Sequence, residues 1–302
     1  MADVTRFQEE ITKAFEAAKN IPKDELIFTY NGVLYPAATC NIDTFKALET
    51  FEAREDDIMM AAYPKCGSNW SVMLLHNIVH TVHNKQPPAL IPIIEFKSPN
   101  KFEKLEAEPS PRVLGTHFYY DNIPKSFSEK KAKILVVFRN PKDTAVSMFH
   151  FYNSNPMLPN YNSFDTFFPD FISGKVVWGS YFDHAVVWNK HLDSDTVLLL
   201  TFEDMKEDLE GSIRKISDFF SMPLTEQQVK LIADKGTFSA MKENSKKNAP
   251  SSPISFFFPG DVGDWKNYFS DAQSQEMDAK FEACLGGTKL GEILKYNIHC
   301  KW

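Results

Sequence analysis

The stretch AAYPKCGSNW, residues 61–70, predicts a strand, a tight loop and the start of a helix within ten residues. The apolar run 58–62 leads into Pro64, Lys65 and Gly67, and helical spacing of apolar residues follows over 70–82. Backbone N–H groups point outward where a glycine-containing loop enters a helix, so such junctions bind anions. The stretch therefore predicts an anion-binding loop in which Lys65 supplies a point charge. The alternative is an ordinary strand–turn–helix junction with a surface lysine.

This loop differs from the nucleotide-binding pattern G-x-x-x-x-G-K-[ST], because Lys65 precedes Gly67 instead of following a second glycine. Ser68 and Asn69 are expected to cap the helix. Cys66 follows the lysine where a Mg²⁺-binding Ser or Thr would stand, and a thiol is a poor ligand for a hard cation. The sequence thus predicts that the anion is bound without a metal.

Composition indicates a globular enzyme. The chain has 302 residues with 43% hydrophobic and 24% charged side chains, and its net charge of −7 argues against nucleic-acid or anionic-membrane binding. We find no signal peptide, no transmembrane segment and no metal-ligand spacing among four cysteines, which favours reduced thiols in the cytosol. The 26 phenylalanines build either a thick aromatic core or a cavity for a flat apolar ligand.

Four strand-like runs alternate with helix-like stretches along the chain. The runs cover 56–63, 112–118, 132–139 and 196–204, and the helical stretches cover 69–83, 142–152, 178–192 and 206–220. This pattern predicts one α/β domain over 1–302 with a central parallel sheet flanked by helices. Ligands bind at the carboxyl ends of such strands. Reactive side chains stand there in each run: Lys65, His117, Arg139 and Glu203-Asp204.

Two of these strand ends suggest specific chemistry. Arg139 and Ser147, in RNPKDTAVSMFHFY (139–152), could converge on one phosphate, although a solvated helix start explains Arg139 equally. His117, in GTHFYYD (115–121), could remove a hydroxyl proton near neutral pH, although most histidines are structural. The segment 241–264 lacks any periodic pattern and predicts a lid or binding loop, followed by the turn GDVGDWKNYFS (260–270).

Taken together, YPKCGSNW, THF, RNPKDTAVSMFHFY, FEDMKED and GDVGDWKNYF resemble the cytosolic sulfotransferase family over nearly the whole chain, most of all its 6B branch. The resemblance implies a single domain of the P-loop-NTPase-like sulfotransferase fold, with 1–55 on the acceptor side and 241–264 as the lid and 3′-phosphate loop. It implies transfer of a sulfuryl group from 3′-phosphoadenosine 5′-phosphosulfate (PAPS) to a hydroxyl or amine, leaving 3′-phosphoadenosine 5′-phosphate (PAP), with no metal.

The resemblance also implies residue roles. His117 would be the general base, assisted by Lys65. The donor would be bound by Lys65, Cys66, Gly67, Ser68, Asn69, Trp70, Arg139, Ser147, Phe202, Phe238, Phe258, Pro259 and Gly260. Trp70 and Phe238 would take the two adenine faces. The acceptor pocket would include Phe118, Tyr119 and Phe151.

The chain departs from the family pattern where R-K-G-x-x-G-D-W-K is expected. Phe258 and Pro259 replace both cations, a loss of about 1.5–3 kcal/mol per charge-assisted hydrogen bond unless Lys242, Lys246 or Lys247 compensates. Gly115, Phe202 and Gly236 also remove a charge or a hydroxyl that relatives carry. The dimer signature is poorly matched over 266–275, which includes Asp271, so a monomer or a weak homodimer is expected.

Three functions stay open at this point. The first is a cytosolic sulfotransferase for a small apolar acceptor, a phenol or an iodothyronine such as thyroxine. The second is a PAPS- or PAP-binding protein with little transferase activity. The third is a nucleotide or small-molecule kinase, which Cys66 disfavours. Cys66 itself is either a packed thiol or, if the helix N-terminus and Lys65 stabilise its thiolate, a redox-sensitive residue.

Overall fold

The computed structural model describes residues 22, 25–85, 92–98, 100–237, 240 and 261–302. Within these ranges, four parallel strands form one sheet in the order β4-β3-β5-β6, and a separate antiparallel hairpin pairs β1 with β2. The strands are β1 (Ile27–Tyr30), β2 (Val33–Pro36), β3 (Ile58–Ala62), β4 (Val113–Thr116), β5 (Lys133–Phe138) and β6 (Val197–Thr201). The predicted α/β architecture with a central parallel sheet is confirmed.

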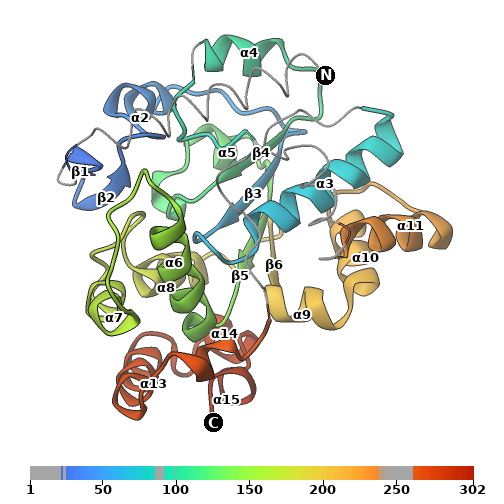
Figure 1. Ribbon diagram of the computed structural model, residues 1–302. Helices are drawn as coiled ribbons and strands as arrows, with labels where there is room; N and C mark the ends of the chain where they lie inside the picture. The colour runs from blue at the N-terminus through green and yellow to red at the C-terminus, as the bar shows by residue number, and fades with distance from the viewer. Residues whose placement is uncertain (1–21, 23–24, 86–91, 99, 238–239, 241–260) are drawn as a thin grey trace.

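Helices cover both faces of the sheet (Figure 1). Those in the N-terminal half are α2 (Ile42–Leu48), α3 (Ser68–His83), α4 (Lys101–Ala107), η2 (Tyr120–Asn122), α5 (Ser126–Glu129) and α6 (Pro141–Ser154). The others are α7 (Phe164–Ile172), α8 (Tyr181–Asn189), α9 (Phe202–Glu207), α10 (Leu209–Phe219), α11 (Glu226–Gly236), η3 (Asp264–Asn267), α13 (Asp271–Leu285), α14 (Lys289–Ile293) and α15 (Tyr296–His299).

The strands are buried on both faces, which is why they read as continuous apolar runs instead of alternating patterns. The connection from β3 to β4 contains α3, and the connection from β5 to β6 contains α6 and α8. These two connections leave the middle of the sheet in opposite directions, so right-handed crossovers place them on opposite faces. Figure 1 shows α3 and α10 on one side of the sheet and α6 and α8 on the other.

Three predicted elements differ from the structure. The run 196–204 does not continue as a strand, because the Thr201 side chain accepts a hydrogen bond from Asp204 N and caps α9, which starts at Phe202. The predicted helix 178–192 is shorter, because Trp178 and Gly179 adopt positive φ angles of 64° and 73° and α8 begins only after the Ser180 cap. The predicted helix 206–220 is two helices, α9 and α10.

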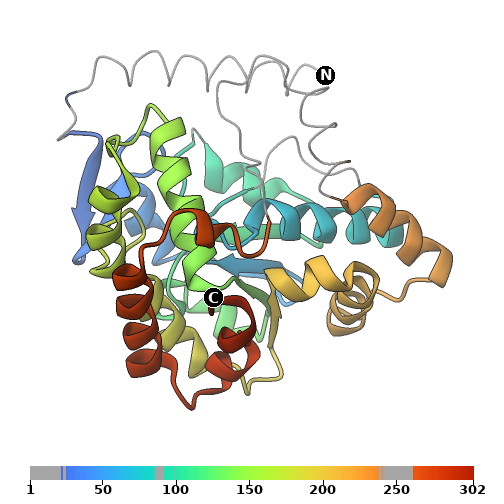
Figure 2. The ribbon, with the colours of Figure 1, turned by 60° about the horizontal axis from the view of Figure 1, so that its bottom comes forward.

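Of the C-terminal helices, α13 packs against α6, α7 and α8, and α14 packs against α8 (Figure 2). Lys142 on α6 is completely buried, and its ammonium group donates to Ser274 Oγ at 2.6 Å and to the carbonyl oxygen of Cys300 at 2.7 Å. The same group lies 2.8 Å from a carboxylate oxygen of Asp278. A buried charge is tolerated because it is fully paired, so α6 has a fixed position between the sheet and the C-terminal segment.

We predict that the buried Arg112–Asp57 pair stabilises the start of β4. Arg112 Nε donates to Asp57 Oδ1 at 2.7 Å, and both side chains are almost completely buried. Arg112→Met leaves a buried carboxylate without its cation and should lower the free energy of unfolding by about 3–5 kcal/mol, as measured by denaturant titration. Arg214→Met, which breaks an exposed ion pair with Glu226, is the matched control and should leave the midpoint nearly unchanged. Equal shifts in the two variants would contradict the prediction.

Candidate functional site

The site lies at the carboxyl edge of the sheet between β3 and β5. The connections that follow these two neighbouring strands lead in opposite directions, which makes their carboxyl ends the topological switch point of the sheet. Open α/β sheets bind their ligands in the crevice at that position. The 63–67 loop follows β3 there, and Arg139 follows β5.

The loop after β3 has a strained backbone that requires glycine at one position. Gly67 has a φ of 103°, and a Cβ there would meet Cδ2 of Phe202 at 3.0 Å, so a side chain is disfavoured both by conformation and by space. Gly67 is the N-cap of α3 and no side chain caps this helix. The expectation that Ser68 and Asn69 cap the helix is therefore wrong, because they are its first two residues. Their backbone N–H groups belong to the first turn, whose donors have no partner within the helix.

Lys65 is the cation of this loop. It is half-buried, has a φ of 74°, and its ammonium group lies 4.8 Å from the centre of the Phe151 ring. Burial lowers the pKa of Lys65 to about 7, and the neighbouring Arg139 acts in the same direction while Cys66 opposes it. Lys65 is a half-buried cation beside a second cation, so an anion bound at the loop would stabilise its charged form.

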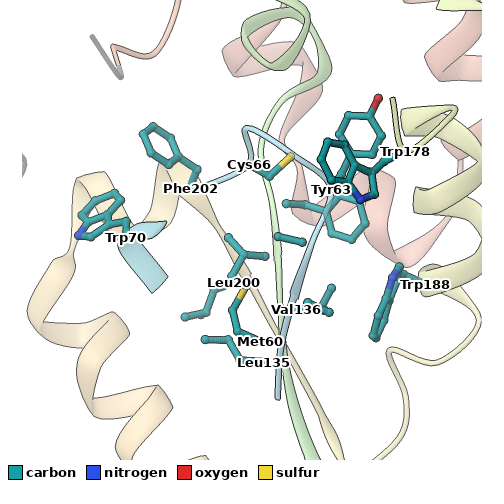
Figure 3. Close-up of a cluster of buried hydrophobic side chains, with 14 of the residues drawn as sticks. Met60, Tyr63, Cys66, Trp70, Leu135, Val136, Trp178, Trp188, Leu200 and Phe202 are labelled. Carbon is teal, nitrogen blue, oxygen red and sulfur yellow. The ribbon is translucent and has the colours of Figure 1, made fainter. Parts of the chain in front are cut away.

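Cys66 is a packed thiol. Its side chain is completely buried, its Sγ lies 3.7 Å from Thr144 Oγ1, and Figure 3 shows it between Phe202 and Tyr63. Burial raises the pKa of the Cys66 thiol to about 12, although Thr144 and Arg139 act in the opposite direction. The complete burial and the raised pKa favour the packed thiol over the redox-sensitive residue, which stays a prediction.

His117 follows β4 and has the geometry of a base. Its Nδ1 lies 2.8 Å from the carbonyl oxygen of Ala62, which only accepts hydrogen bonds, so Nδ1 carries the proton of the neutral ring. The lone pair is then on Nε2. Burial lowers the pKa of His117, while Glu95 and the Ala62 hydrogen bond raise it and Lys65 lowers it. The ring is thus mainly neutral at neutral pH, as a general base must be.

Glu95 is a site residue that the sequence reasoning missed. It is completely buried, and its carboxylate accepts hydrogen bonds from His117 N at 2.7 Å and from Thr116 Oγ1 at 3.0 Å. The nearby Lys101 ammonium donates to the carbonyl oxygens of residues 93, 94 and 96, and burial lowers the pKa of Lys101 to about 8. The signal was a single carboxylate in the apolar run IPIIEF (91–96).

Arg139 lies at the other end of the site. Its side chain is only 4% exposed, its guanidinium carbon lies 4.5 Å from the centre of the Phe202 ring, and Nη2 donates to the carbonyl oxygen of Asp261 at 3.2 Å. Nε is buried, and no acceptor in the described part of the chain bonds to it. A buried guanidinium donor without a partner at the wall of a cavity indicates an absent anionic ligand.

A cavity of about 270 Å³ opens beside Arg139. One wall is a face of α6 made of Asp143, Val146, Ser147 and His150. The other wall consists of Asp261, Asp264 and Tyr268. The structure thus brings Arg139 and Ser147 together on one cavity, as the sequence predicts.

Trp70, in the first turn of α3, and Phe202, at the start of α9, lie next to the loop. Trp70 Nε1 donates to the carbonyl oxygen of Gly236 at 2.8 Å, and its ring meets Phe202 edge to face at 5.3 Å between centres. Figure 3 shows both rings on the same side of the loop, opposite Trp178 and Tyr63. The other predicted donor contacts, Phe238, Phe258, Pro259 and Gly260, lie outside the described residues, as do Lys242, Lys246 and Lys247.

The aromatic residues after His117 have different surroundings. Phe118 is buried and packs against Tyr35 and Phe45, and Tyr119 Oη donates to Ser180 O at 3.4 Å. The rings beside His117 are instead Trp178, at 5.1 Å between centres, and Phe96, at 6.3 Å. Sequence reasoning missed both, because they lie 61 and 21 positions away in the chain. The predicted Phe151 lies next to Lys65.

The described ranges contain neither a metal-binding cluster nor a membrane-spanning helix. Among those residues, no group of three or more His, Cys, Asp or Glu side chains could hold a metal ion. None of the described helices is both long enough and apolar enough to cross a membrane.

The chain is similar to known proteins over nearly its whole length. The profile of the family described as "Sulfotransferase domain" matches residues 55–289. Sulfotransferase 6B1 of Homo sapiens is 47% identical over 302 residues, which cover 100% of both chains. Sulfotransferase 1C2 of Homo sapiens is 37% identical over 279 residues, covering 86% of this chain and 92% of that protein. A crystal structure of mouse sulfotransferase SULT7A1 complexed with PAP superposes with a TM-score of 0.81 at 34% identity, covering 90% of this chain and 98% of the other.

We predict that Glu95 controls the protonation of His117. Glu95→Gln retains a side-chain oxygen for the His117 N–H but removes the negative charge that raises the pKa of His117, so this pKa should fall further. The pKa is measured by NMR titration of labelled histidines, with His117→Gln assigning the resonance. Asp278→Asn on α13 is the control and should leave the His117 resonance unchanged. An unchanged or higher pKa in Glu95→Gln would refute the assignment.

Proposed function

Because the chain belongs to the sulfotransferase family, we propose that it transfers the sulfuryl group of PAPS to the hydroxyl or amine of a small apolar acceptor, leaving PAP. One observation carries this proposal: Lys65, His117 and Arg139 occupy one edge of the sheet, each after a different strand. The combination supplies a neutral base and two anion-binding cations, which is what sulfuryl transfer from a nucleotide needs. PAP bound to mouse SULT7A1 supports the same donor here.

In the proposed reaction, His117 Nε2 removes the acceptor proton as the acceptor oxygen attacks sulfur. The bond between sulfur and the bridging phosphate oxygen breaks, and negative charge develops on that oxygen. Lys65 and the backbone N–H groups at the start of α3 would stabilise this charge from the loop after β3. Preorganised donors of this kind contribute roughly 10²–10³ in rate each. Positioning of donor and acceptor carries most of the remaining effect, since sulfuryl transfer has little covalent assistance from the protein.

The donor is proposed to lie along the edge with its 5′-phosphosulfate at the 65–70 loop and its 3′-phosphate in the Arg139 cavity. Ser147 lines the same cavity and the Arg139 Nε donor is without a partner in the described ranges, which supports that position. Trp70 is proposed as one adenine contact and Phe202 as its neighbour. Phe238, Phe258, Pro259 and Gly260 stay predictions for the remaining contacts.

The acceptor is proposed to be a phenol or an iodothyronine such as thyroxine. Aromatic rings beside His117, namely Trp178 and Phe96, and Phe151 beside Lys65 suit a flat apolar molecule whose hydroxyl meets the imidazole. Phe118 and Tyr119 stay candidate acceptor contacts, although Phe118 is buried against the N-terminal elements. The segment 1–55 is proposed as the acceptor side, and a cytosolic monomer or weak homodimer stays our expectation, since Asp271 is exposed at the start of α13.

A second function has one observation in its favour. Three acidic residues, Asp143, Asp261 and Asp264, line the Arg139 cavity and weaken it as a 3′-phosphate site, so a protein that binds the nucleotide but has little transferase activity is the alternative. Incubation with ³⁵S-labelled PAPS and a panel of phenols, iodothyronines and amines separates the two. Acceptor-dependent appearance of a labelled conjugate supports the transferase, and its absence with PAP binding intact supports the alternative.

His117→Gln should lower kcat by about 10²–10⁴ while leaving the affinity for PAP nearly unchanged, because only proton transfer to Nε2 is lost. Steady-state kinetics and PAP titration measure the two effects separately. His191→Gln is the matched control, since His191 stacks on Tyr120 away from the strand ends. Full activity in His117→Gln would refute the base assignment, and equal loss in both variants would indicate damage to the fold.

The affinity for 5′-AMP should fall as pH rises above about 7. Lys65 has a pKa of about 7 in the unliganded protein, and a phosphate at the loop raises it, so binding above that pH requires proton uptake. The dissociation constant should therefore increase with pH by up to about tenfold per unit. Lys65→Arg stays charged and should remove this slope, whereas Lys65→Met should bind weakly at every pH. An identical slope in Lys65→Arg would show that another group titrates.

A further inference from the structure

His150 is the basic residue that α6 contributes to the lining of the Arg139 cavity. Asp143, Ser147 and His150 recur at helical spacing on one face of α6, so His150 lies one turn beyond Ser147 on the same wall. A ligand that contacts both Arg139 and Ser147 therefore occupies the cavity that His150 lines. His150 is half-buried, which leaves it accessible from that side.

Tyr268 on the opposite wall fixes the orientation of the histidine. Its Oη lies 2.9 Å from His150 Nε2, and the two rings meet edge to face at 5.2 Å between centres. When the imidazole is neutral, Nε2 can accept a hydrogen bond from the tyrosine hydroxyl. When it is protonated, Nε2–H donates to the tyrosine oxygen, and the hydroxyl hydrogen is then available to an anion in the cavity.

The charges around the cavity leave a role for a second cation. Asp143 is already occupied, since its carboxylate accepts from Asn140 Nδ2, Gly263 N and Trp265 N. Asp264 accepts from Asn267, and Asp261 pairs with Lys206. A phosphate monoester carries about 1.5–2 negative charges at neutral pH. Arg139 shares the cavity lining with three acidic residues, Asp143, Asp261 and Asp264, so a further positive charge from His150 would help to balance a bound phosphate.

We propose that His150, oriented by Tyr268, is the second cationic contact for the 3′-phosphate of the nucleotide and becomes protonated when that phosphate binds. This inference rests on the proposed position of the 3′-phosphate beside Arg139 and Ser147. It makes the preference for a 3′-phosphate dependent on pH, strongest where His150 is protonated.

The charged groups around His150 are consistent with protonation of its imidazole when a phosphate binds. Burial lowers the pKa of His150, Asp264 on η3 raises it, and Lys65 from the loop after β3 lowers it. Arg139, which follows β5, and Asp143 on α6 line the same cavity. Asp261 lies on the other wall, and the raised pKa of Tyr268 keeps its hydroxyl neutral near neutral pH. Without a ligand the imidazole is mainly neutral at pH 7.5, and a phosphate adds negative charge beside it, so binding takes up a proton.

The test compares PAP with 5′-AMP on the full chain without metal. The two nucleotides differ only in the 3′-phosphate, so titration of Lys65 at the 5′ end cancels in the ratio of their dissociation constants. We expect this ratio to favour PAP by about three- to tenfold more at pH 6.5 than at pH 8. Calorimetry in buffers of different ionisation enthalpy should show additional proton uptake for PAP over 5′-AMP at pH 7.5.

Two variants assign the effect. His150→Gln keeps a hydrogen-bonding side chain that does not titrate, so the ratio should lose the part of its pH dependence that His150 causes, and PAP should take up fewer protons than with the unsubstituted protein. Tyr268→Phe keeps the titrating imidazole but removes its partner, so it should weaken PAP more than 5′-AMP. His191→Gln is the control and should behave as the unsubstituted protein. Protonation of the 3′-phosphate itself is common to all variants and does not obscure the comparison.

The outcomes separate this inference from the proposed function. If PAP is preferred and His150→Gln has the same ratio, pH dependence and proton uptake as the unsubstituted protein, the role of His150 is refuted and the 3′-phosphate assignment stands. If PAP and 5′-AMP bind alike at every pH, the position of the 3′-phosphate itself is wrong. If His150→Gln weakens the binding of PAP but not of 5′-AMP, and does so only at low pH, the inference is supported.

Discussion

A buried network of Asn140, Asp143 and Glu203 determines the geometry of the carboxyl edge of the sheet. Asn140 N and Nδ2 both donate to Glu203 Oε1, at 3.0 and 2.7 Å, which ties the end of β5 to the end of β6. Asp143 accepts from Gly263 N and Trp265 N, which fixes the segment after residue 260 against α6. All three side chains are almost completely buried, so each unmade bond would be costly. Because the network joins α6 to the segment after residue 260, it fixes the relative position of the two walls of the cavity beside Arg139.

The sequence predicts the elements of the edge better than their junctions. Apolar runs reveal buried parallel strands directly, and they also predict the strand ends at Lys65, His117 and Arg139. The predicted end of β6 lies too far along the chain. The Thr201 side chain caps α9, so the strand-like residues after it form a helix. The hairpin of β1 and β2 turns at Asn31-Gly32, both with positive φ, a signal the sequence contains but one that was not used.

Residues brought to the site from a distance could not be found by pattern. Glu95 and Trp178 reach His117 through the order of the strands and the turn before α8, and neither belongs to a periodic motif. Cys66 is the opposite case. Its neighbours in the sequence suggest a thiolate, whereas its burial in the structure raises the pKa of the thiol. Local chemistry can be read from neighbouring residues, but desolvation depends on the whole packing around a group.

The two ends of the edge have the same electrostatic design. Lys65 at the loop and His150 in the cavity each lie where burial or a neighbouring cation disfavours their charged form. A nucleotide with phosphates at both ends would stabilise both charges at once, so the charge of the site would depend on its occupancy. Such a site contains less repulsion when empty than one built from permanent cations. It would also release its product more readily as pH rises, because the lysine and the histidine would return to their neutral forms.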